Sequence, residues 1–501
     1  MASFNYGDGD DTITGTEFGD DIWPGGGNDV VYAFAGDDTI WSDQGNDYYD
    51  GGLGFDRLFY RNDISGVTVD LLSGTATDGW GNTDTLVSIE RVSGSNYDDF
   101  LYGTNDRDSF SGEQGNDYID GRGGNDFVWY GRATSGIVVD LAAETATGGE
   151  GVDTLVSIEF IGGSNYSDFL YGSSADNWFS PDAEGDIFTP NFDVGGNDYV
   201  DGRGGQDGVS YSGAVAAVYV DLGAGTATDG LGNTDTLVSI EAAIGSQFDD
   251  VLYGSSVDNS LVGQRGSDLL YGLAGNDTNI GGDGNDRIVG GLGSDFVDAG
   301  AGNDLIIDEG LGDWQPGTFV IGARGRPPVL PAPPRAAGQD DDVYIGGTGN
   351  DFYRFVSDPG MDTISGFEAG SGFGDRLGLT ALGIETFAEL LAVSSDTPDG
   401  VLIDLGQRGS ILLEGVRVAE LDPDDLHTPT PILLKGVGPG DLSGFSVSSA
   451  GDVDGDGLDD VIIGARDGDP DGVSRAGESY LVFGSALAAE QGDDGTLDLA
   501  T

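Results

Sequence analysis

The chain has 501 residues, of which 89 are acidic and 19 basic, so its formal net charge is −70. So acidic a surface repels nucleic acid and anionic membranes, and we expect no nucleic-acid partner. Cysteine is absent, which excludes disulfides and zinc–thiolate sites, and no apolar run reaches the 18 residues of a membrane span.

Residues 1–60 consist of nine-residue units with Asp at the sixth position. The segment NYGDGDDTIT is followed by GTEFGDDIW, PGGGNDVVY, AFAGDDTIW, SDQGNDYYD and GGLGFDRLF. A period of nine over contiguous units predicts a repeat architecture. The repeats begin directly after Met1, so we expect no N-terminal signal peptide. The key aspartates of this segment are assigned as Asp11, Asp21, Asp29, Asp38, Asp47 and Asp56.

A longer module interrupts the nonapeptides three times within residues 61–262, at 67–103, 137–172 and 218–254. Alternation in VTVDL, and the TLVSIE segment of each copy, predict short strands and turns. We expect the modules to continue the array, because GSNYDDFLY and its copies re-enter the nonapeptide register. An insertion at 181–194 breaks that register and predicts a surface loop. The key aspartates of this region are Asp99, Asp117, Asp126, Asp168, Asp198, Asp207 and Asp250.

The most regular stretch covers residues 263–307, with five contiguous units and key aspartates Asp268, Asp277, Asp286, Asp295 and Asp304. Each unit has Gly at its fourth position and most have an apolar residue at the eighth. The proline-dense, locally basic segment 308–339 predicts an extended linker.

Two further repeats, with Asp342 and Asp351, open residues 340–430. The remainder of this segment predicts a short helix at 386–391 and a hairpin formed by 401–405 and 410–413. Such a β-rich unit is typical of the cap that closes the end of a repeat array.

The nonapeptide composition indicates calcium. Gly-rich turns adopt conformations that only glycine reaches cheaply and leave carbonyl oxygens pointing into the turn. An Asp at a fixed place adds a carboxylate, and calcium accepts six to eight such oxygens in irregular geometry. One apolar residue per unit buries too little surface to offset the ordering of nine residues. We therefore expect folding to depend on metal.

The nonapeptides resemble the hemolysin-type (RTX) calcium-binding repeats, with the pattern GGxGxDxUx. This resemblance implies an all-β fold, a right-handed parallel β-roll (β-solenoid) in which two units make one turn. It also implies several Ca²⁺ ions held by aspartates 18 residues apart, namely Asp29–Asp47, Asp38–Asp56, Asp268–Asp286, Asp277–Asp295 and Asp286–Asp304. Asn177 and Asn259 stand where Asp is expected, so those turns should bind weakly or not at all.

Residues 440–501 resemble one FG-GAP repeat, the blade unit of integrin-α-type propellers, on the strength of DVDGDGLDD followed by VIIGA. The resemblance implies calcium ligands at Asp452, Asp454, Asp456 and Asp460. Because one blade is not a propeller, we expect an incomplete domain, which belongs either to a fragment of a longer protein or to a truncated gene.

No catalytic constellation is found. Paired carboxylates such as Asp98–Asp99 recur in the modules and favour a structural role over glycosidase chemistry. With His427 as the single histidine, we expect neither a His-based triad nor an HExxH zinc site. The leading hypothesis is a secreted, extracellular or cell-surface bacterial protein, exported by type I secretion machinery. Its role would be structural or adhesive, toward cell-surface polysaccharide or protein. The alternative is the carrier region of a larger enzyme or toxin.

Overall fold

The computed structural model describes most of the chain. The described residues are 2–180, 196–308, 341–355, 360–370, 374–427, 433–435, 443–451, 460–465, 478–482 and 496–498. The predicted loop at 181–194 lies outside them, as does the predicted linker except for its first residue.

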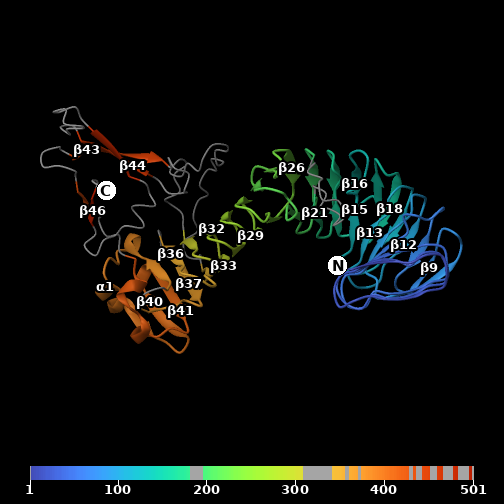
Figure 1. Ribbon diagram of the computed structural model, residues 1–501. Coiled ribbons are helices and arrows are strands. Elements are labelled where there is room, and N and C mark those ends of the chain that lie inside the picture. Colours follow the sequence, from blue (N-terminus) through green and yellow to red (C-terminus); the bar gives the residue numbers. More distant parts are fainter. Residues whose placement is uncertain are drawn as a thin grey trace.

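The nonapeptides form an all-β roll of two facing sheets, here called sheet A and sheet B (Figure 1). Successive units alternate between the sheets, and strands 18 residues apart pair in parallel, as Thr12 with Val30 and Asp21 with Thr39. Two units therefore make one coil, and the predicted parallel roll is confirmed.

Sheet A takes every second strand of the array in chain order. Its parallel strands are β1 (Ser3–Asn5), β3 (Asp21–Trp23), β5 (Thr39–Trp41), β7 (Arg57–Phe59), β11 (Arg91–Ser93), β13 (Ser109–Ser111), β15 (Phe127–Trp129), β19 (Phe160–Gly162), β21 (Trp178–Ser180), β23 (Gly208–Ser210), β27 (Ala242–Ile244), β29 (Ser260–Arg265), β31 (Thr278–Asp283), β33 (Phe296–Ala301), β35 (Val343–Ile345) and β37 (Gly360–Ser365).

Sheet B contains the strands between them. Its nonapeptide strands are β2 (Thr12–Thr14), β4 (Val30–Tyr32), β6 (Tyr48–Asp50), β12 (Phe100–Tyr102), β14 (Tyr118–Asp120), β20 (Phe169–Tyr171), β22 (Tyr199–Asp201), β28 (Val251–Ser255), β30 (Leu269–Ala274), β32 (Arg287–Leu292), β34 (Leu305–Asp308) and β36 (Phe352–Phe355), followed at the end of the sheet by β38 (Arg376–Gly378).

The core is a thin apolar layer between the two sheets. The central residue of each three-residue strand points inward, and Ile13, Val31 and Tyr49 of sheet B face Ile22 and its equivalents of sheet A, all fully buried. The flanking residues of each strand point outward, as the two-residue period of a strand requires. Each unit therefore buries little apolar surface of its own.

The three modules continue the roll and widen one sheet. Each adds one strand to sheet A but an antiparallel set of three to sheet B. The first strand of the set pairs forward with the next nonapeptide, and the third pairs back with the previous one. The sets are β8 (Thr68–Asp70), β9 (Thr75–Thr77) and β10 (Thr83–Val87); β16 (Val138–Asp140), β17 (Thr145–Thr147) and β18 (Val152–Val156); β24 (Tyr219–Asp221), β25 (Thr226–Thr228) and β26 (Thr234–Val238).

This inequality of strand number bends the roll. Sheet B gains two more strands than sheet A at every module, and strands lie about 4.8 Å apart. In Figure 1 the labelled strands β9, β16, β18 and β26 of sheet B run along the outer side of the bend, and β13, β15 and β21 along the inner side. The outward face of sheet B is therefore convex.

The segment after the roll forms the predicted cap. Strand β37 pairs with β41 (Gly409–Glu414), which continues through β40 (Gly400–Asp404) to β39 (Ser394–Asp396) in antiparallel order. Helix α1 (Phe387–Val393) has Thr386 as its N-cap residue, and the Thr386 hydroxyl accepts from the Glu389 amide in a capping box. Short 3-10 turns at Thr380–Leu382, Gly406–Arg408, Val418–Glu420 and Pro423–Asp425 complete the segment. The predicted helix and hairpin are both confirmed.

Beyond the cap, the described residues form five strands. Strands β43 (Ser443–Gly451), β44 (Asp460–Ala465) and β45 (Glu478–Val482) form an antiparallel sheet, and β42 (Leu433–Lys435) pairs with β46 (Thr496–Asp498). None of the helices in the described part of the chain is long and apolar enough to cross a membrane.

Candidate metal centre

The nonapeptide aspartates stack into two rows, one before each sheet. In each row an Asp amide donates to the Oδ1 atom of the Asp in the next coil. All five pairs expected at 18-residue spacing are brought together in this way: Asp29–Asp47 at 2.7 Å, Asp38–Asp56 at 2.8 Å, Asp268–Asp286 at 2.8 Å, Asp277–Asp295 at 2.8 Å and Asp286–Asp304 at 2.7 Å.

The modules divide each row into runs. Ladder B, before sheet B, contains the runs Asp11–Asp29–Asp47–Asp84, Asp99–Asp117–Asp153, Asp168–Asp198–Asp235 and Asp250–Asp268–Asp286–Asp304–Asp351–Asp375. Ladder A, before sheet A, contains Asp20–Asp38–Asp56–Glu90, Asp108–Asp126–Glu159, Asn177–Asp207–Glu241 and Asn259–Asp277–Asp295–Asp342–Asp362.

Many residues inside these runs have a second carboxylate oxygen that no donor in the described structure reaches. Their carboxylates are at most 2% exposed, so water does not supply the missing donor freely. A buried carboxylate oxygen without a partner is strongly unfavourable unless a cation lies beside it. The residues with such an Oδ2 atom are Asp29, Asp38, Asp56, Asp117, Asp126, Asp207, Asp268, Asp277, Asp286, Asp304 and Asp351.

Glycine allows these oxygens to converge with backbone carbonyls. A Cβ atom on Gly281 would lie 2.5 Å from the carbonyl oxygen of Ala299 in the next coil and would also collide with Oδ2 of Asp286. In the same turn Gly282 and Gly284 have φ values of +119° and +149°, where a side chain is strained. The turn therefore offers carboxylate and carbonyl oxygens together, the donor set that Ca²⁺ prefers.

Electrostatics agree with this donor set. Burial raises the pKa of Asp277 to about 7, and burial with the charges of Asp286 and Asp250 raises the pKa of Asp268 to about 8. The pKa of Asp304 rises to about 7, through burial and then the charge of Asp351. A divalent cation would reverse these shifts, because it favours the ionised carboxylate.

The ladder carboxylates alone do not form a complete metal-binding site. Within the described residues no group of three or more His, Cys, Asp or Glu side chains gathers as metal ligands do. Any ion in the ladders would need backbone carbonyls beside one or two carboxylates, as the glycine turns permit.

Five of the expected ligands have both carboxylate oxygens occupied by protein donors. The Tyr49 hydroxyl donates to Oδ2 of Asp47 at 2.9 Å, and Tyr344 donates to Asp342 at 2.7 Å. Asp99 accepts from the Ser95 amide at 2.6 Å, the Ser95 hydroxyl at 2.8 Å and the Val67 amide. Serine and backbone donors hold Asp168 and Asp250 in the same way. These residues are in the ladders, but their bonding does not require a metal.

The placement of Asp21 in the ladder is wrong by one residue. Asp20 donates its amide to Asp38 Oδ1 at 2.7 Å and so occupies the ladder position. Asp21 begins strand β3 and pairs with Thr39 instead. With Asp20 in place the nine-residue spacing runs unbroken from Asp11 through Asp29, a regularity that the sequence already contains.

Sequence reasoning missed the acidic residues that end the runs. Oδ1 of Asp84 accepts the Asp47 amide at 3.1 Å, and Oδ2 accepts the Tyr60 hydroxyl at 3.3 Å. Asp153 with Tyr130 and Asp235 with Tyr211 repeat this arrangement, while Glu90, Glu159 and Glu241 end the ladder A runs. The threefold recurrence of TLVSIE and its preceding Asp was the signal that could have found them. Asp108, Asp362 and Asp375 were missed as well.

The two asparagines behave as neutral substitutes. Oδ1 of Asn259 accepts the Ser255 amide at 2.6 Å and hydroxyl at 3.0 Å, and Asn177 accepts the Ser173 amide at 2.6 Å. Of the predicted ligands in the C-terminal loop, Asp452, Asp454 and Asp456 lie outside the described residues, and Asp460 is described only as the first residue of β44.

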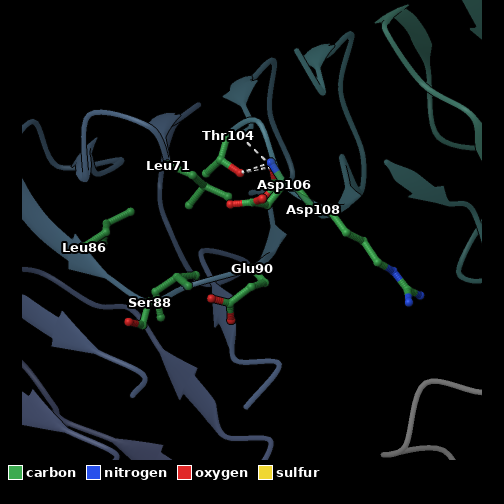
Figure 2. A pocket seen from close by; sticks show the side chains of 9 residues that line it. Leu71, Leu86, Ser88, Glu90, Thr104, Asp106 and Asp108 are labelled. Atoms are coloured by element: carbon green, nitrogen blue, oxygen red, sulfur yellow. Dashed lines mark hydrogen bonds between the residues drawn. The ribbon is translucent and has the colours of Figure 1, made fainter. Parts of the chain in front are cut away.

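A small cavity lies where the first module meets the roll (Figure 2). It has a volume of about 150 Å³ and an apolar wall of Leu71, Leu86 and Ile89 opposite Glu90 and Asp108. Oδ2 of Asp108 already accepts the Thr104 amide and hydroxyl, at 2.6 and 2.9 Å. Pockets for organic substrates are usually about 300 Å³ or larger, so this cavity is smaller than the usual pocket for such a substrate.

Comparison with known families identifies the repeats. A model described as RTX calcium-binding nonapeptide repeat (4 copies) matches residues 6–33, 23–58, 93–128, 244–278, 280–307 and 336–353, and an FG-GAP repeat model matches residues 443–482. The chain therefore carries RTX calcium-binding nonapeptide repeats and one FG-GAP repeat, which confirms both predicted resemblances.

Similarity to whole proteins is low. None of the curated proteins compared matches the chain. Among solved structures, the extracellular lipase LipA from Serratia marcescens is similar at 15% identity and a TM-score of 0.15. The alignment covers 66% of this chain and 39% of the lipase chain, so this chain spans well under half of that protein.

Proposed function

We propose that this RTX-repeat chain is a secreted bacterial protein whose ladders bind a series of Ca²⁺ ions and which folds as those ions bind. The observation that carries the proposal is the set of eleven buried Oδ2 atoms without a hydrogen-bond donor in the described structure. They occur inside the ladder runs and beside glycine turns. Other ladder carboxylates, such as those of Asp47, Asp99 and Asp342, accept from protein donors at both oxygens.

The ligands proposed are therefore a subset of the ladder residues. In residues 263–307 they are Asp268, Asp277, Asp286 and Asp304, together with Asp295, whose amide and Oδ1 atom continue the row. Calcium bound there supplies positive charge to carboxylates that burial otherwise drives toward protonation. Because the unfolded chain has no such site, binding free energy becomes folding free energy.

The biological role follows from this coupling. The low calcium concentration of a cytosol would leave the acidic chain extended and suited to export through type I machinery, and millimolar calcium outside the cell would fold it. A structural or adhesive role at the cell surface is supported by the long curved roll and by the FG-GAP repeat.

Metal analysis of the purified chain tests the proposal. After equilibrium dialysis in 1 mM CaCl₂ and removal of free ion, elemental analysis should find several calcium ions per chain. A triple variant Asp268→Asn, Asp286→Asn, Asp304→Asn should lose some of them. A charge-matched variant altered at the exposed Asp283, at Asp298 and at Asp258 should keep them all. One ion per chain or fewer, or equal loss in both variants, would contradict the proposal.

A further inference from the structure

Two nearly identical aromatic clusters lie on the outward face of sheet B. Cluster 1 consists of Phe100, Tyr102 and Tyr118, and cluster 2 of Phe169, Tyr171 and Tyr199. Each set flanks fully buried residues such as Leu101 and Leu170, so its side chains point away from the core. The first Phe of each cluster is about half exposed, at 49% and 48%.

The ring geometry is the same in the two copies. Phe100 and Tyr118 have centroids 6.2 Å apart at 36°, and Phe169 and Tyr199 are 6.1 Å apart at 35°. The Tyr–Tyr pairs repeat equally closely, at 5.7 Å with angles of 48° and 47°. The strands would fold with smaller outward residues, since the third copy has Val251 at the Phe position.

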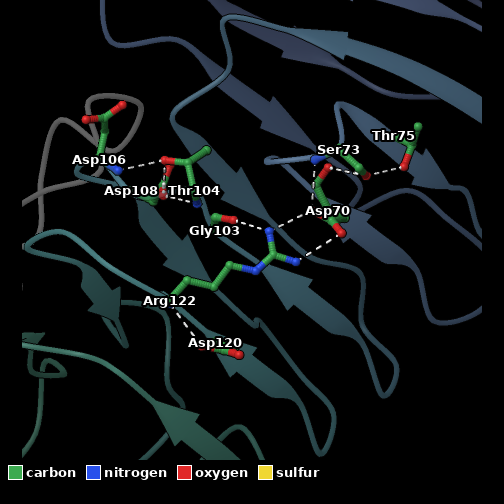
Figure 3. Close-up of polar contacts among 9 residues, drawn as sticks. All are labelled: Asp70, Ser73, Thr75, Gly103, Thr104, Asp106, Asp108, Asp120 and Arg122. Carbon is green, nitrogen blue, oxygen red and sulfur yellow. Dashed lines mark hydrogen bonds and ion pairs between the residues drawn. The ribbon is translucent and has the colours of Figure 1, made fainter.

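A bidentate ion pair borders each cluster, and Figure 3 shows the first of these ion pairs, between Arg122 and Asp70. Arg122 donates to both carboxylate oxygens of Asp70, at 2.8 and 3.0 Å, and to the Gly103 carbonyl oxygen at 2.7 Å. Arg203 repeats these contacts with Asp140 and Gly172. Each guanidinium also lies over a cluster tyrosine, 5.4 Å from the Tyr102 centroid and 5.2 Å from that of Tyr171. The arginine charge is therefore already neutralised within the protein.

The charges of this face select among partners. A nearby carboxylate, Asp120 or Asp201, points outward from the strand beside each cluster, and the whole chain carries −70. Anionic polymers are repelled. Threonines such as Thr75 and Thr77 point outward on the adjoining module strand. The half-exposed aromatic rings match the apolar faces of a neutral sugar chain, and the hydrogen-bond acceptors beside them match its hydroxyl donors.

We infer that clusters 1 and 2 form a paired binding site for a neutral polysaccharide on the convex face of the roll. Five strand pairings separate β12 from β20, which places the clusters about 24 Å apart along the sheet at about 4.8 Å per strand. One glycan chain lying along the sheet reaches both, so the second contact is intramolecular and adds avidity. This inference rests on the proposed surface role and gives that role a partner.

Affinity electrophoresis of the full chain tests it. Native gels containing 2 mM CaCl₂ would also contain dextran, galactomannan or hydroxyethyl cellulose as neutral probes, or alginate as an anionic one. We expect retardation by at least one neutral probe and none by alginate. Phe100→Ala and Phe169→Ala should each weaken the apparent affinity about fivefold, and the double variant by more than the product. Phe296→Ala, which removes an exposed ring from sheet A, is the matched control.

The same samples show whether a negative result concerns the polysaccharide site or the proposed calcium-dependent folding. Circular dichroism with and without calcium reports whether the chain folds on binding the ion. Calcium-dependent folding without retardation by any of the three neutral probes, or with equal retardation of the double variant, overturns the polysaccharide site alone. Retardation by alginate only also overturns it. Absence of calcium-dependent folding contradicts the proposed function instead.

Discussion

At the scale of single residues, the two oxygens of each ladder carboxylate have different roles. Oδ1 accepts the amide of the previous coil, with N–O distances of 2.7–2.8 Å in the regular stretch. This hydrogen bond sets the spacing between coils. Oδ2 is left for a ligand unless a tyrosine or serine of the protein occupies it. Asn can perform the first role but not the second, because its amide carries no charge. Asn177 and Asn259 stand at the start of ladder A runs, where each accepts a serine amide of its own turn instead.

This division predicts the effect of Asp286→Asn. The amide oxygen can still accept from Asp268, so the coil spacing is kept, but one anionic ligand is lost. We expect the calcium midpoint of folding to rise about tenfold, since ligand charge tunes calcium affinity. A calcium titration followed by circular dichroism measures it. Asp283→Asn, which removes the same charge from an exposed side chain of the same turn, should leave the midpoint nearly unchanged. An equal shift in both variants would refute the division of roles.

The raised pKa values predict how the calcium-free chain responds to pH. Burial raises the pKa of Asp38, Asp277 and Asp304 to about 7 from an ordinary 3.8, so the folded state binds more protons than the unfolded one. The associated stability is complete below pH about 4 and is lost as pH rises through about 7. In EGTA we expect more β structure and a higher melting temperature at pH 5 than at pH 8. The opposite trend, or none, would show that these carboxylates are not buried in the metal-free fold.

At the scale of elements, the modules act as terminators of ladder runs. Each ladder B run that meets a module ends in an Asp held by a buried tyrosine, as Asp153 is held by Tyr130 at 2.9 Å. The next begins in an Asp held by a serine, as Asp168 is by Ser164. At the run ends, protein hydroxyls thus donate to the carboxylate oxygens. Inside the runs, we propose that calcium binds the corresponding oxygens.

Removing a terminator hydroxyl should therefore affect stability but not metal content. Tyr130→Phe leaves a buried carboxylate oxygen of Asp153 without its donor, which costs about 1–3 kcal/mol. Urea unfolding in saturating calcium measures the loss, and elemental analysis should find an unchanged calcium count. Tyr97→Phe removes a hydroxyl from a half-exposed ring and should change neither. A fall in calcium count in Tyr130→Phe would place an ion at Asp153.

The sequence predicted the parts of the fold that have a fixed local period. Five units with Asp at the sixth position define the coils of residues 263–307, and TFAELL defines α1 through its capping box. The pairing order within the modules could not be predicted from the sequence. Strand β10 pairs back with β6 while β8 pairs forward with β12, and the alternation of apolar residues is the same for either order. The hydrogen bonds from Ser95 to both carboxylate oxygens of Asp99 could not be predicted either. They depend on a turn geometry that periodicity does not specify.

At the scale of the whole molecule, charge and curvature are the dominant properties. A formal charge of −70 opposes compaction, and the thin core of one apolar residue per strand offsets little of that repulsion. The three modules bend the roll toward sheet A and present sheet B as its convex side (Figure 1). Calcium in the ladders supplies counter-charge where the carboxylates are densest, and the curved outer face displays the aromatic clusters.

The central claim is that calcium supplies much of the folding free energy of the roll. Far-ultraviolet circular dichroism of the full chain at pH 7.5, first in 5 mM EGTA and then in 10 mM free calcium, tests it most directly. We expect a largely unfolded spectrum in EGTA and a cooperative gain of β signal with calcium, while magnesium at the same concentration gives little. A spectrum with the same β content in EGTA and in calcium would contradict the claim.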